Sequence, residues 1–120
     1  MKAKTKWMHA HVYFNLEQTA QAEVFRHKII EHVRGQKMHP MIYQISPLIH
    51  EPIGPHPLPM FEADFESVYY SDVKDFLENY RQGLSVLIHQ LSGDEFWDHT
   101  EGAEFLGKPV ELKMSLFKKV

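Results

Sequence analysis

Two histidines lie two residues apart in the stretch KWMHAHVYFN, residues 6–15, whose alternation is otherwise typical of a β-strand. Met8, Ala10 and Val12 occupy one face of this strand, so His9 and His11 lie together on the other. Imidazole titrates near neutral pH and is a common ligand of first-row divalent metals. The stretch therefore indicates either half of a metal site or a strand with one polar face.

The chain carries nine histidines and no cysteine in 120 residues. The lack of cysteine excludes a disulfide framework, a thiolate nucleophile and a zinc finger. We expect His27 and His32 on a helix surface, whereas the other seven fall at strand ends or in loops, where functional sites are often built. A net charge of -3 argues against nucleic acid as a partner, and no apolar run is long enough to span a membrane. We therefore expect a cytoplasmic protein that does not bind membranes.

The hydrophobic pattern predicts a single α+β domain over residues 1–120. The expected strands are residues 7–14, 38–49, 60–70, 84–89 and 109–117, and the expected helices are 16–35, 72–83 and a short helix within 92–107. Asn15 and Ser71 are the predicted N-caps of the two long helices. Residues 50–59 hold four prolines and a glycine, which predicts a stiff loop.

The order β-α-β-β-α-β with an extra C-terminal strand predicts a ferredoxin-like sandwich, with both helices on one face and strand order 4-1-3-2. We expect strands one and three to be parallel neighbours, flanked by strands two and four in the opposite direction. This arrangement predicts that five histidines gather at one end of the sheet: His9, His11, His50, His56 and His89. The last strand would be an exposed edge, which predicts a homodimer.

Carboxylates of strand three, Glu62, Asp64 and Glu66, are expected on the same face as His9 and His11. A three-histidine site and a site with Glu62 as third ligand both fit the sequence. Any single histidine is explained as well by a surface or loop position, as for His39 and His99, and the acidic row by a solvated sheet face. The predicted convergence of several histidines is what favours a site.

Four stretches, HAHVYF, IGPHP, GLSVLIH and SGDEFWDHTEGAEFLG, resemble the DOPA 4,5-dioxygenase family in order and over nearly the whole chain. The resemblance implies a ferredoxin-like homodimer and a non-haem iron extradiol dioxygenase that opens the ring of DOPA or a related catechol. The histidines of the family's motifs fall on His9, His11, His56, His89 and His99. Gln90 is a departure, because family members usually have proline after the fourth-strand histidine.

The resemblance and the histidine pattern together lead to a specific hypothesis, in which iron(II) is held by His11, His56 and His89. Zinc or nickel could replace iron in purified protein. His9 or His99 is the expected acid-base group, and Tyr13, Tyr43 and Trp97 are expected to contact a small aromatic substrate that reacts with dioxygen. Two alternatives are a non-catalytic module that binds small aromatic ligands and a cofactor-free acid-base enzyme on the same scaffold.

Overall fold

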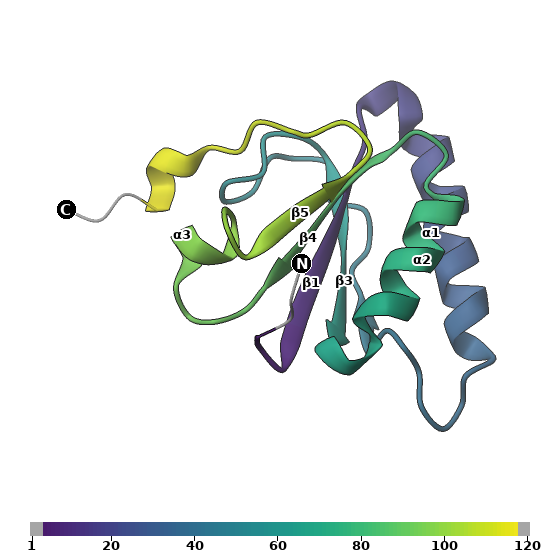
Figure 1. The fold of residues 1–120 in the computed structure, drawn as a ribbon. Helices are drawn as coiled ribbons and strands as arrows, with labels where there is room; N and C mark the ends of the chain where they lie inside the picture. Colours follow the sequence, from purple (N-terminus) through teal and green to yellow (C-terminus); the bar gives the residue numbers. More distant parts are fainter. Residues whose placement is uncertain (1–3, 118–120) are drawn as a thin grey trace.

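The structure is a computed structural model that describes residues 4–117. It contains one five-stranded antiparallel sheet with two helices packed on one face (Figure 1). The sheet order is β2-β3-β1-β4-β5, and the strands are β1 Trp7–Tyr13, β2 Gln44–Ile45, β3 Met60–Glu66, β4 Ser85–Gln90 and β5 Ala103–Leu106. The helices are α1 Thr19–Arg34, α2 Tyr70–Tyr80 and the short α3 Glu95–Asp98. The predicted ferredoxin-like sandwich is confirmed, and its extra strand is β5, within residues 92–107 rather than at the predicted 109–117.

The helix-covered face of the sheet carries the main core. Met8, Ala10 and Val12 of β1 are fully buried there, together with Ala22, Phe25 and Ile29 of α1 and Val73 and Leu77 of α2. The predicted inward set of strand four is also correct, since Leu84, Val86 and Ile88 belong to this core. Each large apolar side chain buried in this way contributes about 1.5–3 kcal/mol relative to an exposed position. This face therefore supplies most of the stability.

The direction of the strands differs from the prediction. β1 runs antiparallel to both of its neighbours, β3 and β4, so the expectation that strands one and three are parallel was wrong. Each helical crossover joins strands that run the same way, β1 to β2 and β3 to β4. β3 pairs antiparallel with β2 and lies between β2 and β1, so it is antiparallel to both. Histidines therefore meet across the middle of one face rather than at one end of the sheet.

Two strand predictions also need correction. The strand expected over residues 38–49 is reduced to Gln44–Ile45, because the Ser46 hydroxyl accepts the hydrogen bond of the Glu62 amide in place of a backbone carbonyl, and Pro47 has no amide to donate. The strand expected over 109–117 is absent. Its residues leave the sheet after β5, and Met114–Phe117 form a 3-10 turn.

The capping predictions had different outcomes. The Asn15 side chain accepts a hydrogen bond from the Gln18 amide at the start of a short 3-10 turn that leads into α1, as expected for an N-cap. Ser71 does not cap α2, which begins one residue earlier, at Tyr70. Within residues 4–117, no helix has the length and apolar character needed to cross a membrane.

The face opposite α1 and α2 is covered by irregular segments (Figure 1). Tyr13, Met60 and Leu87 are buried there under side chains from residues 49–58, from β5 and from the segment after it: Ile49, Leu58, Ala103, Phe105, Val110 and Leu112. The amide of Lys113 donates to the carbonyl of Pro55, which ties the C-terminal segment to the loop. This second face is therefore only partly apolar, and the histidines of the sheet lie on it.

Candidate metal centre

Strand register brings three histidines together. His9 of β1 lies directly opposite His89 of β4, and His11 lies opposite Glu62 of β3 on its other side. Side chains of alternate residues share a face, so His9, His11 and His89 all project away from the helices. His11 and His89 are buried, each 2% exposed, whereas His9 is partly exposed.

The two buried imidazoles face each other through their Nε2 atoms, 2.9 Å apart. Nδ1 of His89 lies 2.8 Å from the Gln90 carbonyl, which can only accept, so Nδ1 carries the proton and Nε2 a lone pair. Nδ1 of His11 faces the Met60 sulfur at 3.1 Å and Glu62 Oε1 at 3.7 Å, both acceptors, which favours the same tautomer. Two facing lone pairs at this distance need a proton or a cation between them.

This geometry fits a metal. Two nitrogens that bind one ion at about 2.1 Å each, at a right angle, lie about 3 Å apart. His9, His11 and His89 each offer one nitrogen, and these three atoms lie within 4.8 Å of one another. In addition, the buried Oδ1 of Asp64 lies beside this group, 3.1 Å from Nε2 of His9. The donor set, neutral nitrogens with carboxylates nearby, is that of a first-row divalent metal.

Burial keeps these imidazoles neutral. It lowers the pKa of His89 to about 3 and that of His11 well below its ordinary value, and neighbouring imidazoles lower both further because two cations would repel. Burial also lowers the pKa of His56 to about 4. Metal ligation requires the unprotonated ring, so the fold presents these nitrogens in the form that a metal binds.

His56 reaches the cluster from the proline-rich loop. Its amide donates to the Ile53 carbonyl, closing a tight turn in which Gly54 has a φ of 55°, a conformation that glycine adopts easily. The His56 ring lies 4.0 Å from the His11 ring, measured between centroids, and its Nδ1 forms a 2.6 Å hydrogen bond with the Tyr13 hydroxyl. Three features therefore hold His56 beside His11: the turn at residues 53–56, the C-terminal segment hydrogen-bonded to Pro55, and the buried Tyr13 hydroxyl.

His9 lies between two carboxylates of β3. Its Nδ1 is 3.5 Å from Glu62 Oε1, and its Nε2 is 3.1 Å from Asp64 Oδ1. Burial lowers the pKa of His9, while the Asp64 charge acts in the opposite direction. Burial together with Asp64 raises the pKa of Glu62 to about 8. The two carboxylates can therefore share a proton near neutral pH, or release it when a cation binds.

His99 approaches from α3. Its Nδ1 lies 2.7 Å from the Glu95 carbonyl, so Nδ1 donates and Nε2 keeps a lone pair. Its ring lies 4.2 Å from that of His89 and stacks on Phe117 at 4.8 Å. Gly102 allows α3 to dock this closely, because a Cβ at that position would lie 2.7 Å from the Trp97 ring.

A cavity of about 330 Å³ opens beside the cluster. Its polar wall consists of five histidines, three acidic residues and one serine: His9, His11, His56, His89, His99, Glu62, Glu95, Asp98 and Ser46. The apolar wall includes Ile49, Ile53, Met60 and Phe117. This volume lies at the lower end of the range for small-molecule sites, which suits a single-ring compound.

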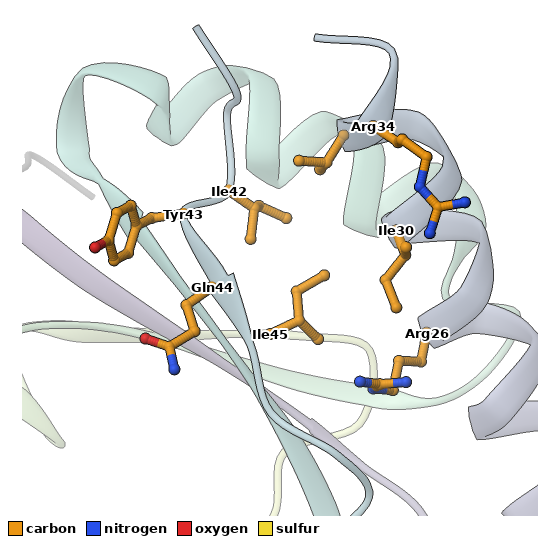
Figure 2. A pocket seen from close by; sticks show the side chains of 8 residues that line it. Arg26, Ile30, Arg34, Ile42, Tyr43, Gln44 and Ile45 are labelled. Atoms are coloured by element: carbon orange, nitrogen blue, oxygen red, sulfur yellow. The ribbon is translucent and has the colours of Figure 1, made fainter. Parts of the chain in front are cut away.

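Several predicted residues lie elsewhere. Tyr43 is 71% exposed, and its ring contacts Trp7 rather than the cluster. Figure 2 shows it at the rim of a separate hollow against α1, with its ring pointing away from Ile42 and Ile45. Trp97 packs against Gly102 and does not line the cavity. His50 contacts Phe14 beyond the end of β1, so its predicted membership of the cluster was wrong.

Tyr13 is placed behind His56 rather than in the cavity wall, because its hydroxyl is bonded to the imidazole and the residue is 1% exposed. Met60 and Phe117 were missed from the sequence. Met60 lies two residues before Glu62 on the same strand face, so the alternation of β3 could have identified it. Phe117 had no local signal, because its position depends on how the C-terminal segment crosses the sheet.

Comparison with known proteins shows similarity to one family. The family model described as "Dopa 4,5-dioxygenase family" matches residues 8–116. An uncharacterized 21.2 kDa protein of Botryotinia fuckeliana is 31% identical over 118 residues, covering 92% of this chain and 62% of that protein. A protein of Amanita muscaria named DOPA 4,5-dioxygenase is 25% identical, covering 96% of this chain and 51% of that protein. The chain thus spans about half to three-fifths of these curated relatives.

Among solved structures, a candidate dioxygenase of Nostoc punctiforme superposes with a TM-score of 0.77 at 27% identity. The superposition covers 93% of this chain and 90% of the other. The similarity therefore extends over the whole sandwich, including the strands that carry the histidines.

Proposed function

Because the chain belongs to the Dopa 4,5-dioxygenase family, we propose that it is a non-haem iron dioxygenase that opens the ring of DOPA or a related catechol beside the diol. The observation that carries the proposal is the pair of facing Nε2 atoms of His11 and His89, 2.9 Å apart, in the wall of a cavity of ring size. No thiolate is present, so the donor set suits oxygen chemistry better than electron transfer.

In this proposal His11 and His89 hold iron(II), and His9 is the third donor because its nitrogen lies within 4.8 Å of theirs. The sequence-based assignment of His56 as third ligand remains a prediction, supported by the 4.0 Å ring contact with His11. Bound iron would supply Lewis acidity toward the catechol hydroxyls and redox activity toward dioxygen. Zinc or nickel in the same site would be inactive replacements.

The remaining wall groups position the substrate and move protons. The apolar side chains Ile49, Ile53 and Phe117 enclose an aromatic ring and exclude water. His99 is the proposed proton acceptor for a catechol hydroxyl, because its Nδ1 is fixed on the Glu95 carbonyl and its Nε2 has a free lone pair. Tyr13 and the 53–56 turn keep His56 in place during the reaction.

The proposed reaction balances without a further reductant. The carbon–carbon bond beside the diol breaks, and both atoms of dioxygen enter the product. One becomes a carboxylate oxygen, and the other becomes the oxygen of an aldehyde. The product is a conjugated semialdehyde, which is yellow and therefore easy to follow.

The test begins with protein purified without a tag and loaded anaerobically with iron(II). Oxygen uptake and product absorbance are then measured with DOPA, protocatechuate, caffeate and catechol. We expect uptake of one dioxygen per product with at least one substrate, and none with zinc-loaded protein. Iron-loaded protein that binds catechols without consuming oxygen would show a binding module instead. Turnover that persists after chelation would show a cofactor-free enzyme.

Metal content separates the two third-ligand assignments. His9→Ala and His56→Ala variants are compared by elemental analysis after identical loading. Loss of metal in His9→Ala alone supports His9 as the third ligand. Loss of metal in His56→Ala alone supports His56. His27→Ala, on the exposed face of α1, is the matched control and should keep its metal.

We also propose that the protein forms a homodimer. The segment 109–117 forms no strand, so the edge available for pairing is that of β5, Ala103–Leu106, the last strand on that side of the sheet. Sedimentation should give a dimer at micromolar concentration, and a monomer at that concentration would contradict the proposal.

A further inference from the structure

A second hollow adjoins the histidine cavity. It has a volume of about 630 Å³ and shares four lining residues with the cavity: Leu91, Glu95, Asp98 and Phe117. The residues found only in its own lining are Gly93, Asp94, Phe96 and Leu116. The four shared residues border both hollows, so Glu95 faces a ligand beside the histidines as well as the second hollow.

The two hollows share an unusual charge pattern. The second hollow is lined by three carboxylate residues, Asp94, Glu95 and Asp98, and within residues 4–117 neither lining includes a lysine or an arginine. The Asp98 side chain is buried, and both of its oxygens lie 3.0 Å from the Ser92 amide. The Asp94 side chain caps α3 by accepting from the Trp97 amide. These two negative charges are therefore fixed in place by the backbone.

Apolar surface lies beside the charges. Leu91, Phe96 and Leu116 are large hydrophobic residues with exposed fractions of 38%, 48% and 60%, and all three line the second hollow. Carboxylates next to exposed apolar side chains suit an alkyl chain that ends in an ammonium group. They disfavour a chain that ends in a carboxylate, because like charges at close range repel.

We propose that the substrate is a catechol with a cationic amine side chain, and that Glu95 is the main determinant of this preference. The inference rests on the proposed ring-cleaving function. Glu95 is chosen because its side chain is exposed and it lines both hollows, at the point where they adjoin. The ammonium group would replace part of its hydration with the Glu95 carboxylate, while the ring stays beside His99.

Three catechols that share a two-carbon unit on the ring test the inference: dopamine, 4-ethylcatechol and 3-(3,4-dihydroxyphenyl)propionate. They differ at the end of the chain, which is cationic, neutral or anionic at pH 7. For iron-loaded protein at low salt, we expect kcat/KM to be about tenfold higher for dopamine than for the propionate, with 4-ethylcatechol between them. Raising the ionic strength to about 0.3 M should reduce the ratio several-fold, because salt screens exposed charges.

A binding measurement provides a readout that does not depend on turnover. Calorimetry with zinc-loaded protein should show the same order of affinity for the three compounds. Glu95→Gln should lower the dopamine-to-propionate ratio about threefold in both measurements, as expected for one partly exposed charge. Glu23→Gln makes the same charge change on α1, on the far side of the sheet, and should leave the ratio unchanged.

The outcomes separate this inference from the proposed function. If no catechol is cleaved, including neutral 4-ethylcatechol, the ring-cleaving function fails, and the zinc-loaded affinities still decide the charge preference. If 4-ethylcatechol is cleaved but the propionate equals or exceeds dopamine in kcat/KM and in affinity, the charge preference is wrong while the function stands. Equal effects of Glu95→Gln and Glu23→Gln would overturn the role of Glu95.

Discussion

On β1, Met8, Ala10 and Val12 pack beneath the two long helices, whereas His9, His11 and Tyr13 face loops on the other side of the same strand. The first set is fully buried among apolar neighbours and contains no titratable group. The second set is also largely buried, but among imidazoles, carboxylates and a phenol. Alternation along a single strand therefore separates the residues that hold the fold from those proposed to form the metal site. Substitutions on the two faces should give different phenotypes.

The largest effect on stability is expected on the helix face. Phe61→Ala removes a side chain that is fully buried in the main core, and the resulting cavity should lower the free energy of unfolding by about 3–5 kcal/mol. Urea unfolding of metal-free protein measures this change. Phe96→Ala is the matched control, because Phe96 is 48% exposed and its loss should cost less than about 1 kcal/mol.

On the histidine face, His11→Ala and His89→Ala should lose metal while the protein stays folded. Removal of one of the two facing donors should weaken metal binding more than about 100-fold, the upper end for loss of an outer-shell partner. Metal titration and circular dichroism measure the two properties separately. Variants that unfold would show that the histidine face is needed for folding. Variants that retain wild-type metal affinity would show that the substituted histidine is not a ligand.

The stability of the metal-free protein should depend on pH through titratable groups on the histidine face. The pKa values of His89 and His56 are lowered from 6.5 to about 3 and about 4, so the unfolded chain binds more protons between those values and 6.5. Stability of the metal-free protein should therefore fall as the pH drops below 6.5. The pKa of Glu62 is raised from 4.5 to about 8, so its contribution is lost as the pH rises from 4.5 to 8.

Together these shifts predict maximal stability of the metal-free protein near pH 6.5, which thermal unfolding across the pH range can test. Glu62→Gln should remove the decline between pH 6.5 and 8 and leave the acid side in place. A decline that is the same in wild type and Glu62→Gln would mean that Glu62 is not the group responsible.

The smallest effect is expected for Tyr13→Phe, which keeps the ring and removes one buried hydrogen bond to His56. The loss should be about 1 kcal/mol in unfolding free energy. It should also reduce catechol turnover more than metal content, because the bond positions His56 without contacting the metal site directly. Equal losses of turnover and metal would instead indicate that His56 is a ligand.

The faces of the strands could be predicted from the sequence because they depend only on alternation. The period of two placed His9 and His11 opposite Met8 and Ala10, and the same rule gave the inward residues of β4. The direction of β3 relative to β1 was predicted wrongly. The crossovers determine it, and no side-chain pattern within either strand distinguishes parallel from antiparallel pairing.

Contacts made by irregular segments were the least predictable. Residues 109–117 alternate like a strand, yet Val110 and Leu112 pack onto the histidine face while the backbone leaves the sheet. Tyr43 and His50 have residue types suited to the site but lie away from it, because loop paths depend on long-range docking. His56 lies in the loop predicted over residues 50–59, and the 53–56 turn places its ring beside that of His11.

The register that sets His9 opposite His89 has a further consequence for refolding experiments. If β4 slipped by one residue against β1, its core side chains and its histidine would both turn to the wrong face. A misregistered chain could still show strand content by circular dichroism, but it would lack the facing nitrogens. Recovery of metal binding after denaturation would therefore report the fraction of molecules with correctly paired central strands, independently of any enzymatic assay.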